Sequence, residues 1–324
     1  MNPILSELLN QAERVVLLGH IHPDGDCIGT CLGLYNYLQE YYPQLHTDLY
    51  LDHPNRKFSY LKNFDKIQTE ADSEAVYDLC ITMDSSDTER LGQYVKFFTS
   101  AKKTFCIDHH ITNQRFAEEN YILPEASSSS EVLYGLLEQK LSREIAECLY
   151  TGIVHDTGVF KFSCTSPETM EIAGHLMEAG LDCARIIDDS FYRRTYIQNQ
   201  ILGRALLESI LLLDGRCIFS ALDQKELELF GASSNDLDGV IDQLRITEGV
   251  ECAIFIYEKN AQEYKVSMRS NSYVDVSRIA AYFGGGGHVR AAGCTIGGSA
   301  RDVLNKLLEH LEAQMKEHNR KEQE

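Results

Sequence analysis

The sequence predicts an α/β protein with two domains, and three observations carry that prediction. Four short apolar runs alternate with helix-like segments through the first half of the chain. This alternation is typical of a mostly parallel sheet with helices on both faces. Strand-like runs return after residue 213 and lead to four consecutive glycines. The length, 324 residues, suits two domains better than one.

Each element of the first half has a local signal. Apolar, β-branched runs predict buried strands at residues 15–19, 48–51, 78–83 and 104–107. Helical periodicity predicts helices at residues 28–40, 130–140, 145–156 and 167–179. The last of these helices has Ser166 as its expected N-cap and Gly180 as its stop.

The pattern changes in the second half. Residues 184–213 are mostly helical and polar. Strands are expected at residues 217–222, 252–257 and 264–269, with helices at 274–282 and 300–316. The sequence therefore predicts an N-terminal domain over residues 1–190, a helical linker over 191–212, a smaller C-terminal α/β domain over 213–318 and a frayed tail over 319–324.

Charge and composition narrow the classes of partner. The net charge is −19 and the sequence pI is about 5.0, so the chain repels a long nucleic acid. No apolar stretch reaches the ~20 residues of a membrane helix, and the N-terminus does not resemble a secretory signal. The ten cysteines occur as singles, typical of free thiols in a reducing cytoplasm. We expect a cytoplasmic protein that binds neither membranes nor long nucleic acid.

Titratable side chains are crowded where the first strand ends. His20, Asp24 and Asp26 lie in the loop that follows residues 15–19, and such loops carry the ligand sites of parallel sheets. Pro23 stiffens this loop, while Gly25 lets both carboxylates turn to one side. The alternative is structural, because Asp24 could simply cap the next helix.

The same residue types recur at later element ends. Asp84 follows the third strand, Asp108, His109 and His110 follow the fourth, and Asp156 ends a helical stretch. Each has a structural alternative, as a helix cap or as a carboxylate that fixes a histidine tautomer. Together they place acidic and imidazole groups on one edge of the sheet, where uncompensated carboxylates would repel one another.

This repulsion predicts bound cations. Carboxylates and imidazoles without thiolates suit two divalent ions of the manganese, magnesium or iron type. One carboxylate can bridge two ions about 3.5–4 Å apart, the spacing of two-metal phosphoryl-transfer sites. Such ions activate water and neutralise phosphate oxygens.

Two signatures resemble a known family. The first is His20-x-x-x-Asp24-x-Asp26, Asp84, Asp108-His109-His110 and Asp156, which resembles the DHH phosphoesterase superfamily. The second is Gly284-Gly285-Gly286-Gly287-His288-x-x-Ala291-Ala292-Gly293, which resembles the glycine-rich DHH-associated C-terminal domain. Together they cover nearly the whole chain. The two-domain form is similar to bacterial oligoribonucleases (nanoRNases) that also remove the 3′-phosphate from pAp (3′-phosphoadenosine 5′-phosphate).

The resemblance implies a role for each residue of the first signature. The implied metal ligands are His20 and Asp24 for one ion, Asp26, His109 and Asp156 for the other, and Asp84 as the bridge. Asp108 would orient a histidine, and His110 would contact the scissile phosphate or the leaving oxygen. The implied ions are manganese first, with magnesium or cobalt as alternatives.

The glycine run predicts a close approach by a ligand. Backbone N–H groups of Gly285, Gly286 and Gly287 can cradle a phosphate, with His288 as a further donor. A flexible linker is the alternative. The resemblance also places Arg269 at a strand end facing the substrate, with Ser270 and Asn271 as helpers. An exposed arginine at a strand end is the competing interpretation.

The leading hypothesis is a metal-dependent phosphohydrolase that degrades RNAs of two to about five nucleotides to mononucleotides and dephosphorylates pAp. A phosphodiesterase for cyclic dinucleotides or linear pApA is an alternative within enzymes. A pyrophosphatase and a RecJ-like exonuclease fit the sequence less well. A non-catalytic nucleotide-binding module is the alternative from another class. A homodimer is compatible with the sequence.

Overall fold

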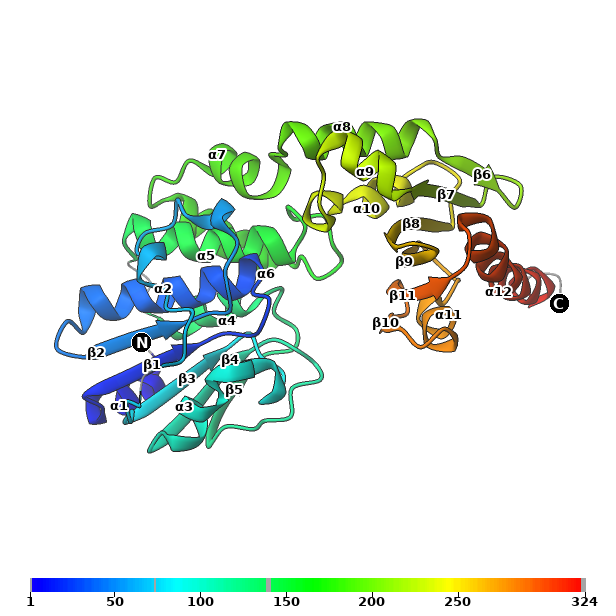
Figure 1. Cartoon of the computed structure of the whole chain (residues 1–324). Coiled ribbons are helices and arrows are strands. Elements are labelled where there is room, and N and C mark those ends of the chain that lie inside the picture. Colours follow the sequence, from blue (N-terminus) through cyan, green and yellow to red (C-terminus); the bar gives the residue numbers. More distant parts are fainter. Residues whose placement is uncertain (1, 73, 138–140, 322–324) are drawn as a thin grey trace. The chain divides into compact units, whose positions relative to one another are not determined.

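The computed structural model describes residues 2–72, 74–137 and 141–321. The chain divides into two compact units, Met1–Arg193 and Arg194–Glu324 (Figure 1). Both units are α/β, so the predicted fold class is confirmed. The boundary follows a short π-helix, η4 (Asp188–Tyr192).

The first unit is built on a five-stranded parallel sheet in the order β2-β1-β3-β4-β5. The strands are β1 (Arg14–Leu18), β2 (His46–Tyr50), β3 (Leu79–Met83), β4 (Lys103–Asp108) and β5 (Glu119–Ile122). The four predicted strands are present, and β5 is an additional strand at the edge of the sheet. Because all the strands are parallel, their carboxyl ends lie along one edge of the sheet.

Helices cover both faces of this sheet. They are α1 (Pro3–Gln11), α2 (Gly25–Tyr41), α3 (Val95–Ser100), α4 (Ser129–Leu136), α5 (Arg143–Asp156), α6 (Pro167–Met177) and α7 (Cys183–Ile187). Along β1, Val15 and Leu17 join a core with α2, α4 and α5, whereas Val16 and Leu18 join a second core with α3. All four side chains are fully buried, and each stabilises the fold by about 2 kcal/mol.

Several short helical turns complete the first unit. They are η1 (Arg56–Phe58), η2 (Phe64–Lys66) and η3 (Glu89–Tyr94). The predicted Ser166 cap is present: its hydroxyl accepts from the Thr169 N–H at 3.1 Å. The helix predicted over residues 130–140 ends at Leu136, and residues 138–140 lie outside the described part of the chain.

The second unit contains a six-stranded sheet in the order β10-β11-β9-β8-β7-β6, in which only β7 and β8 pair in parallel. The strands are β6 (Ile210–Leu212), β7 (Cys217–Leu222), β8 (Cys252–Asn260), β9 (Glu263–Ser270), β10 (Gly286–His288) and β11 (Ala291–Gly297). The helices are α8 (Tyr196–Leu207), α9 (Gln224–Phe230), η5 (Ser234–Leu237), α10 (Val240–Arg245), α11 (Val276–Tyr282) and α12 (Ala300–Lys321).

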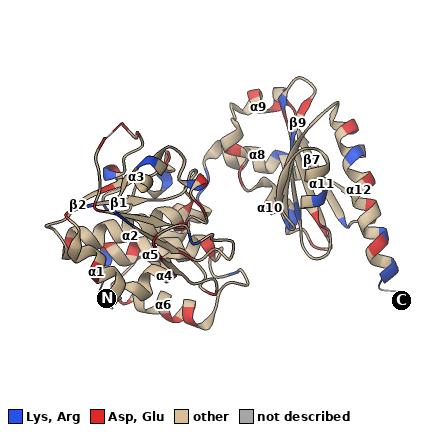
Figure 2. Cartoon of the chain, turned by 90° about the horizontal axis from the view of Figure 1, so that it is seen from below, with Lys and Arg blue, Asp and Glu red and all other residues tan. Residues whose placement is uncertain are grey.

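This sheet also has a core on each face. Ile254 and Val266 pack with α11 and α12, whereas Ala253 and Phe255 pack with α8 and α10. Lysine, arginine and acidic residues alternate along α12, whose apolar residues face the sheet (Figure 2).

Two stretches differ from the prediction. The sequence predicts a helical linker over residues 191–212, but α8 packs with buried Ile201 and Ala205 on the second sheet, and Ile210–Leu212 forms strand β6. The tail predicted to fray over residues 319–324 is helical as far as Lys321, and residues 322–324 lie outside the described part. The apolar stripe of α12 continues to Met315 and anchors this helix.

The described cysteines are all free, and most are buried. Among the helices that the structure describes, none has the length and apolar character needed to cross a membrane.

Candidate metal centre

The residues of the first signature meet at the carboxyl edge of the parallel sheet. They are His20 after β1, Asp24 and Asp26 at the start of α2, Asp84 after β3, Asp108, His109 and His110 at the end of β4, and Asp156 at the end of α5. Residues up to 136 positions apart in the chain, from His20 to Asp156, are thus brought to one edge. This placement follows from parallel pairing, because each strand must end on the same side.

Two imidazole rings are oriented by backbone carbonyls. Nδ1 of His20 lies 2.7 Å from the carbonyl oxygen of Ile21, and Nδ1 of His109 lies 3.3 Å from that of Ala126. A carbonyl oxygen only accepts, so these contacts place the ring hydrogen on Nδ1. The Nε2 lone pair of each ring is therefore available to a metal ion.

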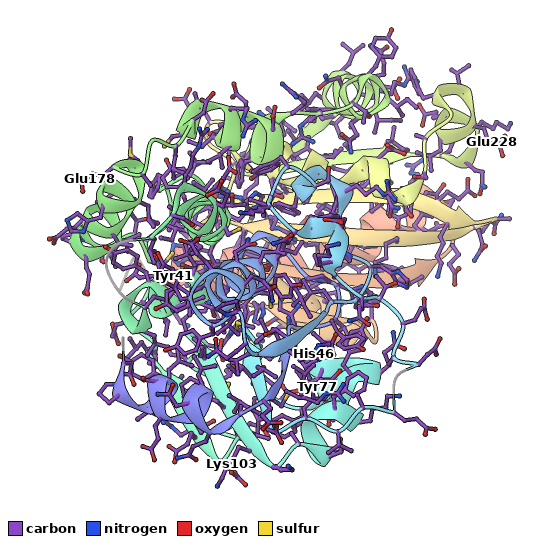
Figure 3. All side chains as sticks on the ribbon, turned by 90° about the vertical axis from the view of Figure 1, so that its left-hand side faces the viewer. Tyr41, His46, Tyr77, Lys103, Glu178 and Glu228 are labelled. Carbon is purple, nitrogen blue, oxygen red and sulfur yellow. The ribbon has the colours of Figure 1, made fainter. Side chains whose placement is uncertain are left out.

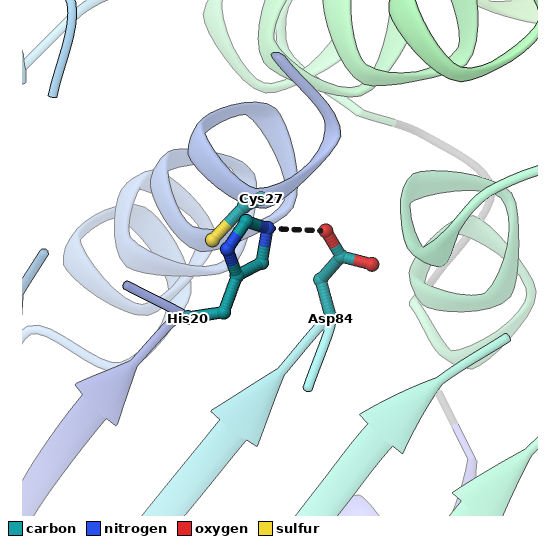
Figure 4. A group of neighbouring side chains, drawn as sticks. All are labelled: His20, Cys27 and Asp84. Carbon is teal, nitrogen blue, oxygen red and sulfur yellow. Dashed lines mark ion pairs between the residues drawn. The ribbon is translucent and has the colours of Figure 1, made fainter. Parts of the chain in front are cut away.

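Asp84 lies at the centre of the group. Its carboxylate oxygens are 3.4 Å from Nε2 of His20, 3.8 Å from Nε2 of His109 and 3.7 Å from Nδ1 of His110. Figure 4 shows Nε2 of His20 pointing at this carboxylate. The backbone of Asp84 has φ of 57°, a left-handed conformation that costs a non-glycine residue about 1 kcal/mol or more and is often found at functional sites.

Asp26 is fully buried and held by the first turn of α4. Its carboxylate accepts from the N–H groups of Ser129 and Ser130 at 2.6 and 3.0 Å and from the hydroxyl of Thr30 at 3.2 Å. Despite these bonds, burial and the carboxylate of Asp84 raise the pKa of Asp26 to about 7. The site therefore holds more negative charge than its protein partners compensate.

Asp156 supports the same conclusion. Burial and the carboxylates of Asp26, Asp84 and Asp24 raise the pKa of Asp156 to about 9. One of its oxygens lies 3.2 Å from Nε2 of His109. Divalent cations among these groups would remove the repulsion, and the donor set of carboxylate oxygens and imidazole nitrogens fits such ions.

Three groups of side chains are close enough to hold an ion, within the described residues. They are His20 with Cys27 and Asp84, Asp84 with His109 and His110, and Asp26 with His109 and Asp156, and in each group the candidate ligand atoms lie within 4.8 Å of one another. Asp84 belongs to two of the groups, and so does His109. A shared carboxylate such as Asp84 is the arrangement expected of two neighbouring ions, whereas the single Nε2 lone pair of His109 can bind only one of them.

Asp24 lies at the edge of this group. Its side chain is 60% exposed, and Oδ1 is 3.8 Å from Nε2 of His20. The same oxygen accepts from the N–H groups of Asp26 and Cys27 at 3.1 Å, so Asp24 caps α2 as the structural alternative predicts. A capping carboxylate keeps a second oxygen free, so the cap does not exclude a metal role.

Asp108 and His110 form a separate pair. Asp108 is fully buried, and its Oδ1 lies 2.7 Å from Nδ1 of His110, while its Oδ2 accepts from the side-chain amide of Asn113 at 2.6 Å. Although burial opposes the shift, the His110 and Asn113 contacts lower the pKa of Asp108. The same hydrogen bond raises the pKa of His110, which favours its protonated form.

Sequence reasoning missed two contributors to this site. The hydroxyl of Ser129 donates to Asp84 at 3.0 Å, and Ser127–Ser130, a run of four serines, is almost completely buried. The four consecutive serines are visible in the sequence, but their burial is not, and serines at a helix start are expected for capping alone. Cys27 was also missed; its thiol lies beside the His20 ring, one helical turn into α2 (Figure 4). Burial disfavours charge on His20, but Cys27, Asp24 and Asp84 together raise its pKa.

In the second unit, the side chains predicted to bind substrate already make contacts within the protein. The Arg269 guanidinium pairs with Asp242 at 3.2 Å and lines a cavity of about 320 Å³ with Lys265 and Ser267. The hydroxyl of Ser270 is buried and donates to the carbonyl of Val274 at 2.6 Å.

The Asn271 amide donates to the carbonyls of Arg245 and Val250 at 3.1 and 2.7 Å. The side chains of Ser270 and Asn271 therefore shape the turn after β9, in contrast to their predicted role as helpers on a substrate.

The glycine run is a strand rather than an open loop. Gly286–His288 form β10, which pairs with β11, and all three residues are exposed. A Cβ atom on Gly285 would lie 2.2 Å from the carbonyl oxygen of Gly293, and one on Gly287 would lie 2.5 Å from that of Ala291. Packing thus explains these two glycines, whereas a Cβ atom on Gly286 would meet nothing within 4 Å.

Comparisons with known proteins agree with this architecture. Residues 14–153 match the model of the DHH family, N-terminal domain, and residues 218–317 match that of the DHHA1 domain. The chain is 29% identical to the bifunctional oligoribonuclease and PAP phosphatase NrnA of Thermus thermophilus, over 94% of this chain and 92% of the relative. It is 26% identical to the protein of the same name from Bacillus subtilis, over 98% and 100%.

A solved structure shares the fold. The crystal structure of an exopolyphosphatase-related protein from Bacteroides fragilis superposes with a TM-score of 0.87 at 23% identity, covering 96% of this chain and 95% of that chain.

Proposed function

Because the chain belongs to the DHH family, we propose that it is a cytoplasmic, metal-dependent phosphohydrolase that degrades very short oligoribonucleotides to mononucleotides and removes the 3′-phosphate from pAp. The observation that carries this proposal is the convergence of buried carboxylates and oriented imidazoles at one sheet edge. The net charge of −19 favours short substrates, because a long RNA backbone would be repelled.

The proposed metal ligands are those that the family resemblance implies, and the clusters at the sheet edge support most of them. We assign His20 and Asp24 to one ion, Asp26, His109 and Asp156 to the other, and Asp84 to both. The central position of Asp84, 3.4 Å from His20 and 3.8 Å from His109, supports a bridging role. When bound, the ions supply positive charge at the scissile phosphate and make an attacking water more acidic. Manganese is the proposed ion, with magnesium or cobalt as alternatives.

Asp108 and His110 act beside the ions. Asp108 accepts from Nδ1 of His110 and fixes the ring, and Asn113 fixes Asp108 in turn. The Asp108 hydrogen bond raises the pKa of His110 and so favours the protonated ring, in which Nε2 can donate to a phosphate oxygen or to the leaving oxygen. Asp108 is a positioning residue in this assignment, and His110 is the residue that touches the substrate.

The second unit supplies the remaining substrate contacts in this proposal. Gly286 and Gly287 are exposed and would offer backbone N–H groups, and His288 offers an exposed ring. The N–H of Gly285, by contrast, already donates to the carbonyl of Ala280 at 2.8 Å. Arg269 would clamp a phosphate by exchanging its contact with Asp242, a carboxylate that is half exposed.

The test uses the purified full chain, stripped with EDTA and reloaded with manganese. Ribodinucleotide pApA, pAp and inorganic pyrophosphate are each supplied, and Asp84→Ala serves as the matched variant. We expect hydrolysis of pApA and pAp, little hydrolysis of pyrophosphate, and near-complete loss in Asp84→Ala. No turnover of pApA or pAp would refute the proposal, and nucleotide binding without turnover would favour a non-catalytic module.

A further inference from the structure

Three exposed apolar side chains belong to the loops that carry the signature residues. Ile21 lies in the loop after β1, Ile111 in the loop after β4 and Phe162 in the turn after α5. The metal centre uses none of these side chains. Phe162 is the aromatic one of the three, and it is 48% exposed. Its ring therefore offers a flat apolar surface to a ligand that approaches this turn.

The backbone that leads to Phe162 is strained. Gly158, Val159 and Phe160 have φ of 56°, 60° and 61°. The left-handed region is strongly unfavourable for a β-branched residue such as Val159. Strain of this kind is often kept where the chain has a function. Val159 and Phe160 also pack against the core of the first unit, which holds the turn in this conformation.

Hydrogen bonds to Thr157 fix the same turn. Thr157 directly follows Asp156 and is fully buried. Its carbonyl accepts from the N–H groups of Lys161 and Phe162, each at 2.9 Å, and its hydroxyl accepts from the N–H of Phe160 at 3.0 Å. These bonds tie the backbone of Phe162 to the residue next to a proposed metal ligand.

The turn also folds back on Asp156. A Cβ atom on Gly158 would lie 2.5 Å from the Phe162 ring, so one side of the ring packs directly on the Gly158 backbone. The thiol of Cys164, two residues after Phe162, donates to the carbonyl of Asp156 at 3.7 Å. The ring is thus supported from below within two residues of Asp156, and the rest of it stays exposed.

The charge of the turn suits a nucleotide. Residues 157–165 include one cation, Lys161, and no carboxylate. Lys161 is exposed, and its ammonium group makes no hydrogen bond or ion pair within the described residues. A cation next to an aromatic ring matches a ligand that joins a phosphate to a flat base.

We infer that Phe162 is a platform on which a nucleobase of the substrate stacks. The inference rests on the proposed function and deepens it, because it names the side chain that recognises the base. Stacking accepts every base, since each has a flat π-face. A platform of this kind suits an enzyme that degrades short RNAs of any sequence and also accepts the adenine of pAp.

The test compares two ligands of equal charge, AMP and ribose 5-phosphate, of which the second lacks the base. Calorimetry on the full chain in manganese gives Kd for each, and the measured quantity is Kd for ribose 5-phosphate divided by Kd for AMP. In the wild type this ratio should be about ten or more. Phe162→Ala and Phe162→Leu should lower it about tenfold without changing Kd for ribose 5-phosphate. Phe162→Tyr keeps the aromatic face and should keep the ratio.

Tyr41→Ala is the matched control. Tyr41 is 44% exposed, close to the value for Phe162, but it ends α2 at the end of the sheet where the strands begin. Figure 3 views the unit from this end and labels Tyr41 together with His46 and Lys103, the first residues of β2 and β4. Tyr41→Ala should keep the wild-type ratio.

The comparison needs no turnover, because AMP is a product of the proposed reaction. If the wild type hydrolyses neither pApA nor pAp, the proposed function fails while the two Kd values still decide the platform. A wild-type ratio near one or an unchanged ratio in Phe162→Ala and Phe162→Leu would overturn the inference. An equal loss of affinity for both ligands, or the same change in Tyr41→Ala, would also overturn it, since either would show a structural effect.

Discussion

Without bound metal ions, the protein is expected to become less stable as the pH rises from 6 to 8. The folded chain keeps protons on Asp156 up to about pH 9 and on Asp26 up to about pH 7, whereas an unfolded aspartate loses its proton near pH 3.9. In this pH window the folded state binds more protons than the unfolded state. The free energy of unfolding must therefore fall as the pH increases.

The magnitude follows from the linkage slope of about 1.4 kcal/mol per pH unit for each extra proton. Over two pH units Asp156 contributes up to about 2.7 kcal/mol, and Asp26, which titrates midway, adds about 1.4 kcal/mol. Solvent reaches Asp156, whose side chain is 31% exposed, so screening reduces this limit of about 4 kcal/mol to about 2 kcal/mol. For a unit of this size that is a fall of about 4–8 °C in Tm. The raised pKa values of His20 and His110 act in the same direction.

The assay is thermal unfolding at pH 6, 7 and 8, in EDTA and again in saturating manganese. Bound cations replace the protons, so manganese should raise Tm most at pH 8. Asp156→Asn removes the carboxyl group that accounts for about two thirds of the proton excess of the folded state, so it should reduce the fall of Tm between pH 6 and pH 8 in EDTA by about two thirds. The control is Asp72→Asn, which changes an exposed carboxylate. A Tm in EDTA that is equal or higher at pH 8 than at pH 6, or an unaltered slope in Asp156→Asn, would refute the reasoning.

Three further predictions concern single side chains. Asp84→Ala should lower the manganese-dependent rate on pAp by about 100-fold or more with an unchanged circular dichroism spectrum, because Asp84 is the proposed ligand of both ions; retention of most of the rate would contradict the bridging role. Ser129→Ala removes the hydroxyl that donates to Asp84 at 3.0 Å and should weaken manganese binding about tenfold, measured by calorimetry; equal affinity would show that this bond does not position the carboxylate. Gly286→Ala should leave Tm unchanged, since its Cβ atom meets nothing within 4 Å, but raise KM for pAp about tenfold if a phosphate approaches this backbone. Gly203→Ala on α8, which is also unobstructed, is the control and should leave KM unchanged.

Much of the first unit could be predicted from sequence because its strands are short, apolar and followed at once by charge. The run that ends at Leu18 and the one that ends at Met83 both identify a buried strand and its carboxyl end. Strand β10 could not be predicted in this way, since glycine has low strand propensity. Its pairing with β11 is a tertiary effect, made possible by the close approach at Gly285 and Gly287.

The candidate site likewise contains some residues that could be predicted from the sequence and others that could not. Charged residues such as Asp26 and Asp156 are visible in the sequence because they recur, together with histidines, at the ends of several elements, although any one of them alone could have a structural role. Serines carry no such signal, since they are common at helix starts for capping alone.

The metal centre depends on the start of α4 as well as on the residues of the signature. The Ser129 N–H bonds Asp26 from α2, and the hydroxyl of the same residue bonds Asp84 from β3. One residue at the start of α4 therefore sets the separation of two carboxylates that would otherwise repel each other. Since metal–ligand distances tolerate deviations of only about 0.2 Å, a chain can keep every ligand and still lose affinity when this helix start moves. The buried serines at the start of α4 thus position the acidic residues of the centre.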